Sequence, residues 1–293
     1  MEQLLQVVFT GLSQGGIYAL IGLGFSLVMM STRILNLAHG SYVLLGGFVF
    51  LSLSTSWEWP PLLAVLVAVA AIGALGFLTE RVLNIRARPW RQPSLDTAVL
   101  TTLALLVVFE GAAFLVWGPD PHRAPALHPG VFSLFGAVVV WQSVWMLVSA
   151  LFISAGLHLF FRRTWTGRAM RACAENPTTT CLLGINTRLI GSLAFTISAV
   201  LGAIAGLLVS PVTWIDYQMG GFFMLKGVLA YLTGGEEEVA GPLVGGMLLG
   251  LVENLLLLFP GMTGGLLKQV VPMAVLIAIL VFRPQGILAA RRS

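Results

Sequence analysis

Long apolar stretches separated by short polar ones cover almost the whole chain. The apolar stretches lie at about 4–30, 36–55, 62–78, 95–117, 138–161, 189–209, 220–233, 239–259 and 266–282. Most are close to the ~20 residues that a helix needs to cross a bilayer, and they lack the alternation of a membrane β-barrel. The pattern predicts an all-α polytopic membrane protein, with a single transmembrane domain over residues 1–293.

Two of these stretches leave the number of crossings open. The first is longer than one crossing needs, so it is expected to be tilted or broken at Gly15-Gly16. The stretch 220–233 is short and contains Lys226, and it is interrupted by the polar run 234–238. It either crosses the membrane, which gives nine crossings, or is re-entrant, with eight as the competing count. We therefore expect about 8–9 transmembrane helices.

Composition excludes a soluble protein. Hydrophobic residues make up 57% of the 293 positions and charged residues 10%, whereas a soluble domain has about 25% charged residues. The net charge of +4 does not indicate nucleic-acid binding, because the basic residues gather in short loops between apolar stretches and in the C-terminal tail.

The arginines predict the orientation. If the polar segment 162–188 is cytoplasmic, alternating crossings place Arg33, the 81–91 loop and the C-terminal tail on the same side. Arg123 is the one arginine that falls outside. The positive-inside rule then predicts an N-out, C-in topology.

The segment 162–188 is the longest polar interval in the chain. It contains five arginines, one acid (Glu175) and Pro177. A basic loop of this length between membrane helices suits contact with a cytoplasmic partner, besides its topogenic role. Its two cysteines, Cys173 and Cys181, match no zinc-ligand spacing.

The sequence contains little that could carry catalysis. It has no GxxxxGK[ST] or GxGxxG motif, no Ser/His/Asp set and no acid or cysteine cluster around its four histidines, so we expect no enzyme activity and no metal site. Charged or titratable residues inside apolar stretches are functional candidates by default. They either form an ion relay or are paired at interfaces and helix contacts: Glu110, His158, Lys226 and Glu253.

Four motifs occur together along the chain. They are LNLAHGS (35–41), RACAENPTTTCLLGIN (171–186), a glycine pair followed by GP and VGG (234–246), and RPQGIL (283–288). In combination they resemble the permease subunits of branched-chain amino acid ABC importers, and more closely the LivH-type half than the LivM-type half. Length and hydropathy are similar over essentially the whole chain. The resemblance implies a multi-pass, non-catalytic subunit of the bacterial inner (cytoplasmic) membrane.

The same resemblance implies partners. These would be a second homologous permease subunit, two cytoplasmic ATPase subunits, a periplasmic solute-binding protein and the lipid bilayer, with no nucleic acid. ATP and magnesium would be bound by the ATPases, so this chain would hold no cofactor. Whether the two permeases are copies of one chain or two different chains stays open.

In that family the loop corresponding to 171–186 contacts the ATPase. The resemblance implies a turn at Ala174–Asn176 and a short helix over 178–183. ATP-driven closure of the ATPase dimer would push this helix and so move the permease between outward and inward states. The residues expected to couple the chain to the ATPase are Arg168, Arg171, Ala174, Glu175, Asn176, Leu182, Leu183 and Gly184. One departure from the family pattern is the acidic run Glu236–Glu238, whose role stays open.

The solute implied is a branched-chain or other hydrophobic amino acid, or a related small molecule. Gly-, Ser- and aromatic-rich faces of 4–30, 36–55 and 189–209 would line its path. The expected path residues are Gln14, Tyr18, Asn36, His39 and Ser41. His39 equally suits a hydrogen-bonded residue at a helix start.

The alternative function is a secondary transporter, which needs no ATPase but predicts an inverted repeat; no convincing repeat is visible.

Overall fold

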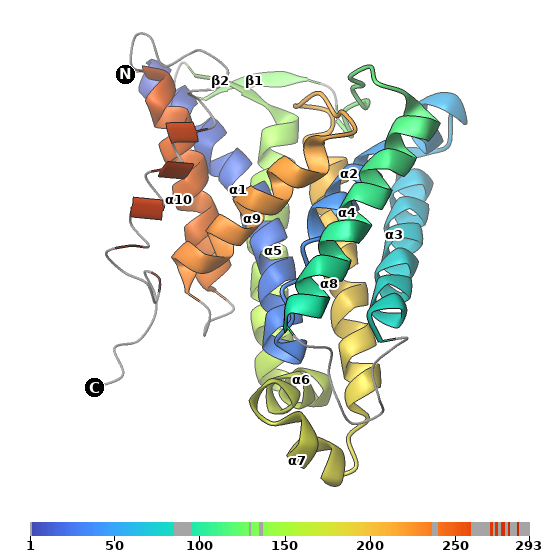
Figure 1. Cartoon of the computed structure of the whole chain (residues 1–293). Coiled ribbons are helices and arrows are strands. Elements are labelled where there is room, and N and C mark those ends of the chain that lie inside the picture. The colour runs from blue at the N-terminus through green and yellow to red at the C-terminus, as the bar shows by residue number, and fades with distance from the viewer. Residues whose placement is uncertain are drawn as a thin grey trace.

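The fold is that of a computed structural model, which describes residues 2–84, 95–128, 130–134, 137–235 and 240–258, with isolated positions between 270 and 286. Helices dominate the described ranges (Figure 1). The longer ones are α1 (Glu2–Thr32), α2 (His39–Leu51), α3 (Pro61–Asn84), α4 (Leu95–Trp117), α5 (Trp141–Arg163), α8 (Thr187–Val209), α9 (Met219–Gly234) and α10 (Gly241–Leu255). The shorter ones are α6 (Trp165–Glu175), α7 (Pro177–Leu182), a π-helical turn (Ser52–Ser56) and a 3-10 turn (Leu256–Leu258).

The predicted helical membrane fold is confirmed. Within the described ranges, five helices are long and apolar enough to cross a bilayer, namely α1, α3, α4, α5 and α8. Helices α2, α9 and α10 are shorter, with 13, 16 and 15 residues. The count of eight or nine crossings and the N-out, C-in orientation stay predictions.

Helix α1 is the centre of the bundle. It is buried over most of its length and contacts α5, α8, α9 and α10, whereas α3, α4 and α5 are largely exposed on their outer faces. It runs without interruption through Gly15-Gly16, so a break there is excluded. The two glycines instead face different neighbours, because a Cβ at Gly15 would meet the backbone at Met247 of α10 and one at Gly16 would meet Ala150 of α5.

Helices α9 and α10 form a hairpin packed on α1. Near its turn, Ala230 of α9 and Pro242 of α10 both approach Gly22 of α1. Helix α1 continues ten residues further, to Thr32, which is roughly 15 Å of helix. In Figure 1 the lower ends of α9 and α10 lie above the lower ends of α1 and α5. Whether 220–233 crosses the membrane or is re-entrant stays a prediction.

A small β-hairpin lies at the end of the bundle near the N-terminus (Figure 1). Strands β1 (Val131–Leu134) and β2 (Ala137–Val140) pair antiparallel, with Val131 opposite Val140. The apolar run expected to begin a helix at about 138 therefore starts as a strand, and α5 begins at Trp141. Three consecutive valines, which are stiff β-branched residues, account for the difference.

Glycines set the distance between α2 and α8. A Cβ at Gly206 of α8 would overlap the carbonyl oxygen of Val43 on α2, and one at Gly202 would meet Tyr42. These two glycines form a GxxxG pair, and small residues in this spacing commonly allow membrane helices to approach closely.

We expect Gly206→Ala to destabilise the protein by about 1–3 kcal/mol, the usual cost of overpacking a tight contact. The measurement is denaturant titration of the purified protein in detergent. Gly156→Ala is the matched control, because no atom lies within 4 Å of a Cβ built there, and alanine favours a helix over glycine. Equal behaviour of the two variants would contradict the packing argument.

Candidate functional site

The polar segment 162–188 folds into two short helices at the end of the bundle opposite the N-terminus (Figure 1). Thr164 caps α6, its hydroxyl accepting a hydrogen bond from the amide of Gly167. Asn176 caps α7 in the same way, accepting from the amide of Thr179, and Pro177 occupies the first helical turn, where its missing N–H costs nothing. A helix from Pro177 to Leu182 agrees with the short helix expected over 178–183.

Arginines attach this segment to the bundle. The Nε of Arg33, just after α1, donates to the carbonyl of Ala174. The Nη2 of Arg171 donates to the carbonyl of Phe161 at 2.6 Å, and Arg168 lies over the ring of Trp165 at 5.6 Å. Arg171 therefore holds α6 against the end of α5, besides any role toward a partner.

The end of α7 exposes apolar side chains away from the bundle. Leu182 and Leu183 are 80% and 76% exposed, and Glu175 and Asn176 are also exposed. Gly184 follows with a φ of 85°, a conformation that glycine adopts without strain and that ends the helix. Apolar side chains exposed together beyond the membrane-spanning helices are typical of a surface that binds a partner.

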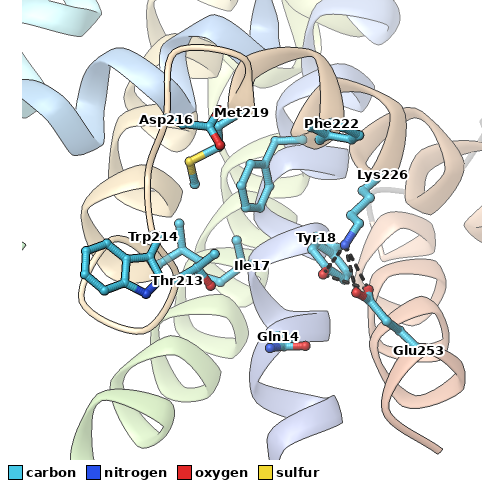
Figure 2. A pocket seen from close by; sticks show the side chains of 12 residues that line it. Gln14, Ile17, Tyr18, Thr213, Trp214, Asp216, Met219, Phe222, Lys226 and Glu253 are labelled. Carbon is cyan, nitrogen blue, oxygen red and sulfur yellow. Dashed lines mark hydrogen bonds and ion pairs between the residues drawn. The ribbon is translucent and has the colours of Figure 1, made fainter. Parts of the chain in front are cut away.

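A cavity of about 270 Å³ lies between α1, the α8–α9 connection, α9 and α10. Figure 2 shows side chains from these elements converging on it. Its polar lining residues are Gln14, Tyr18, Thr213, Asp216, Lys226 and Glu253, and its apolar ones are Ile17, Val209, Trp214, Met219, Phe222 and Phe223.

An ion pair forms part of the cavity wall (Figure 2). The Nζ of Lys226 lies 2.9 and 3.0 Å from the two carboxylate oxygens of Glu253. The Tyr18 hydroxyl donates to Glu253 at 2.8 Å and accepts from Lys226 at 2.7 Å. Both charged side chains are nearly buried, 13% and 6% exposed. Each charge is thus compensated, as burial requires.

The five residues expected along the solute path fall into two groups. Gln14 and Tyr18 line the cavity, and Gln14 also accepts from the side chain of Asn254 at 2.8 Å. Asn36, His39 and Ser41 are fully buried around the start of α2 and lie apart from the described cavity lining. His39 is the first residue of α2, and its Nδ1 lies 2.9 Å from the Ser198 hydroxyl. This is the hydrogen-bonded helix-start role weighed for it.

Glu110 has a local structural partner. Its Oε1 accepts a hydrogen bond from the amide of Gly221 at 2.9 Å, in the first turn of α9. A carboxylate is favourable at a helix N-terminus because it compensates free N–H groups and the helix dipole. Glu110 therefore anchors the start of α9 to α4.

Sequence reasoning missed the pairing of Lys226 with Glu253 and the contribution of Thr213 and Asp216. The first two were considered singly, because nothing in the sequence shows that residues 27 positions apart meet across a helical hairpin. The other two lie in a connection without a motif. Three or more His, Cys, Asp or Glu side chains placed to hold a metal ion are not found in the part of the chain that the structure describes.

The model of one protein family, described as branched-chain amino acid transport system / permease component, matches residues 7–280. The chain belongs to this family. The match covers every long helix of the bundle, so it identifies the chain as a whole as a multi-pass membrane permease component.

Individual relatives agree with the family. The chain is 32% identical to the high-affinity branched-chain amino acid transport system permease protein BraD of Pseudomonas aeruginosa, over 97% of this chain and 95% of the relative. It is 30% identical to the corresponding permease protein LivH of Escherichia coli, with the same coverage. At the fold level it is similar to a chain in the structure of PsaBC from Streptococcus pneumoniae in complex with Fab, with a TM-score of 0.50, 14% identity, and 96% and 91% of the two chains covered.

In this permease, replacing one partner of the ion pair is expected to lower the free energy of unfolding more than replacing both partners. Lys226→Met leaves the Glu253 carboxylate nearly buried without its cation, and we expect a loss of up to about 3 kcal/mol. The double variant Lys226→Met/Glu253→Leu is expected to lose less than the single variant, because no charge is left unpaired and only the Tyr18 hydroxyl loses its partners. Denaturant titration in detergent measures both. Additive losses in the double variant would contradict the interpretation.

The cysteines test the orientation. Cys173 is buried and Cys181 is partly exposed, and burial, with a smaller contribution from Cys181, raises the pKa of the Cys173 thiol. A raised pKa means less thiolate at neutral pH, so Cys173 is expected to react more slowly. A membrane-impermeant maleimide should label Cys181 in washed inverted vesicles and leave it unlabelled in intact cells. Cys181→Ser is the control, and labelling from outside the cell would contradict the N-out, C-in prediction.

Proposed function

We propose that this chain is the permease subunit of an ATP-driven importer for branched-chain or other hydrophobic amino acids, or related small solutes. The observation that carries the proposal is the family match over residues 7–280. The names of the relatives BraD and LivH, high-affinity branched-chain amino acid transport system permease proteins, support the solute class. The cavity is lined by charged, aromatic and aliphatic side chains, which suits a small, partly apolar solute.

The subunit acts together with partners. A second homologous permease completes the translocation path, two cytoplasmic ATPases bind ATP and magnesium, and a solute-binding protein delivers the solute at the outer face of a bacterial inner membrane. This chain itself is non-catalytic. The proposal is supported by its polar end, which carries an exposed apolar helix tip rather than a set of catalytic side chains.

Helix α7 is the element through which the ATPases drive the permease. The exposed Leu182 and Leu183 enter a groove of the ATPase, and Arg168 and Glu175 are also exposed on this segment. Because Arg33 and Arg171 bond α6 to the rest of the bundle, a displacement of α7 is transmitted to α1 and α5. ATP binding then shifts the population between two permease states, since the contacts at α7 differ between them.

Purification decides between this importer and a secondary transporter. We expect an ATPase to co-purify with the chain from its native membrane, and uptake of radiolabelled leucine into proteoliposomes to require ATP and that ATPase. Uptake by the chain in the absence of any ATPase would overturn the proposal in favour of a secondary transporter.

Glu175→Arg is expected to uncouple ATP hydrolysis from uptake. The substitution reverses a charge on the exposed surface of the segment without touching the buried bundle, so the purified complex should keep its elution profile while leucine uptake falls about tenfold or more per ATP hydrolysed. A tenfold change corresponds to about 1.4 kcal/mol at the interface, within reach of one charge contact.

Two further variants sharpen this measurement. Glu175→Gln removes the charge and keeps the size, so it should lie between the wild type and the reversal. Leu182→Glu/Leu183→Glu should release the ATPase, whereas Leu182→Met/Leu183→Met should retain it because the surface stays apolar. Wild-type coupling in Glu175→Arg, together with a retained ATPase in the glutamate pair, would remove the role proposed for α7.

A further inference from the structure

We propose that Lys226 and Glu253 are the residues that bind the charged head of an α-amino acid zwitterion as it passes through the cavity. The inference rests on the proposed function, because it names the chemistry by which that solute is held. In the bound state the solute carboxylate takes the position of the Glu253 carboxylate beside Lys226, and the solute ammonium takes the position of the Lys226 ammonium beside Glu253.

The charges of the cavity wall complement a zwitterion. Among its described lining residues, one is a cation, Lys226, and two are acids, Asp216 and Glu253. Lys226 and the hydroxyl of Tyr18 are donors suited to a carboxylate, and the two acids are acceptors suited to an ammonium group. Charge-assisted hydrogen bonds of this kind are stronger than neutral ones and depend on direction, so they select a solute that carries both charges.

The ion pair lowers the cost of keeping both charges inside the bundle. A bare ammonium and a bare carboxylate inside a membrane protein would be expensive to bury, and here the two groups compensate each other at 2.9 Å. A zwitterion supplies one group of each sign. Lys226 therefore exchanges the Glu253 carboxylate for the solute carboxylate, and Glu253 exchanges the Lys226 ammonium for the solute ammonium. No charge is left unpaired during the exchange.

The rest of the cavity suits an apolar side chain of moderate size. The wall around the charges includes Ile17, Met219 and Phe223. A volume of about 270 Å³ is roughly twenty times the minimum that one water needs, which is enough for an amino acid with an aliphatic side chain. The methionine side chain adapts to several aliphatic shapes, so the cavity is expected to accept leucine, isoleucine and valine alike.

A purely structural role is the competing interpretation. A buried ion pair is weak evidence for stability, since replacing both partners with apolar residues is often neutral or stabilising. This pair lies in a cavity wall rather than in the packed interior, and a tyrosine hydroxyl is hydrogen-bonded to both of its members. Polar groups inside membrane helices that face a cavity characteristically mark a solute pathway.

Protection of an engineered cysteine tests binding directly. Thr213 is exposed and lines the cavity, so Thr213→Cys, in a chain with Cys173→Ala and Cys181→Ser, should react with a charged thiosulfonate reagent. In the complete transporter, saturating leucine should slow this reaction. Leucinamide, which lacks the carboxylate, and 4-methyl-2-oxopentanoate, which lacks the ammonium, should not slow it; glycine should protect less than leucine because it fills no apolar space.

Variants connect the protection to the ion pair. Lys226→Met/Glu253→Leu should fold, because no charge is left unpaired, but should need about tenfold or more leucine for protection, since at least one charge-assisted hydrogen bond is lost. Lys226→Arg keeps the charge and should protect like the wild type. Glu110→Gln is the matched control, because it neutralises an acid that contacts α9 outside the cavity lining, and it should leave protection unchanged.

Protection and uptake together separate the two proposals. Leucine protection that depends on Lys226 and Glu253, without any ATP-driven uptake by the wild type, would overturn the proposed function and leave the site standing. ATP-driven leucine uptake with equal protection in the wild type and the double variant would overturn the site alone. Equal protection by leucine, leucinamide and the oxo acid would also overturn it, because the charged head would then contribute nothing.

Discussion

The close approach of α1 to its neighbours is the constraint on which the rest of the structure depends. In a bilayer, lipid tails are as apolar as leucine, so helices associate through tight packing rather than through the hydrophobic effect. Glycines on α1 and α10 bring the two backbones into direct contact, with Gly15 against Met247 and Gly250 against Gly11. A side chain at these positions would separate the helices. The separation of the helices then decides whether groups on α1, α9 and α10 can meet at all.

The charged cluster is a consequence of this packing. Lys226, Glu253 and Tyr18 belong to three helices, and the hydrogen bonds between them need donor–acceptor distances near 2.8 Å. Close packing of the helix backbones at glycines brings these long side chains within reach of one another. The cavity beside them arises because the α8–α9 connection, rather than another long helix, covers this part of α1.

Helix α1 also connects the two ends of the molecule. Gln14 and Tyr18 line the cavity, and Arg33, directly after the last turn, bonds the carbonyl of Ala174 in α6. A rigid helix that lines a solute cavity and ends at the segment proposed to receive force can carry a displacement between them without a chain of small side-chain shifts. The short helix α7, with its exposed leucines, follows α6 in this segment.

The sequence alone determined the membrane class, the helical fold and the polar segment, because hydropathy and caps such as Asn176 are local properties that persist in any arrangement of the helices. The GxxxG spacing of Gly202 and Gly206 is also visible in the sequence, since spacing along a helix is local too. Only the tertiary structure decided that Gly15-Gly16 does not break α1, that His39 is buried away from the cavity, and that Lys226 meets Glu253. These outcomes depend on which helix lies beside which, and contacts between residues far apart in the chain leave no mark in the pattern of any one segment.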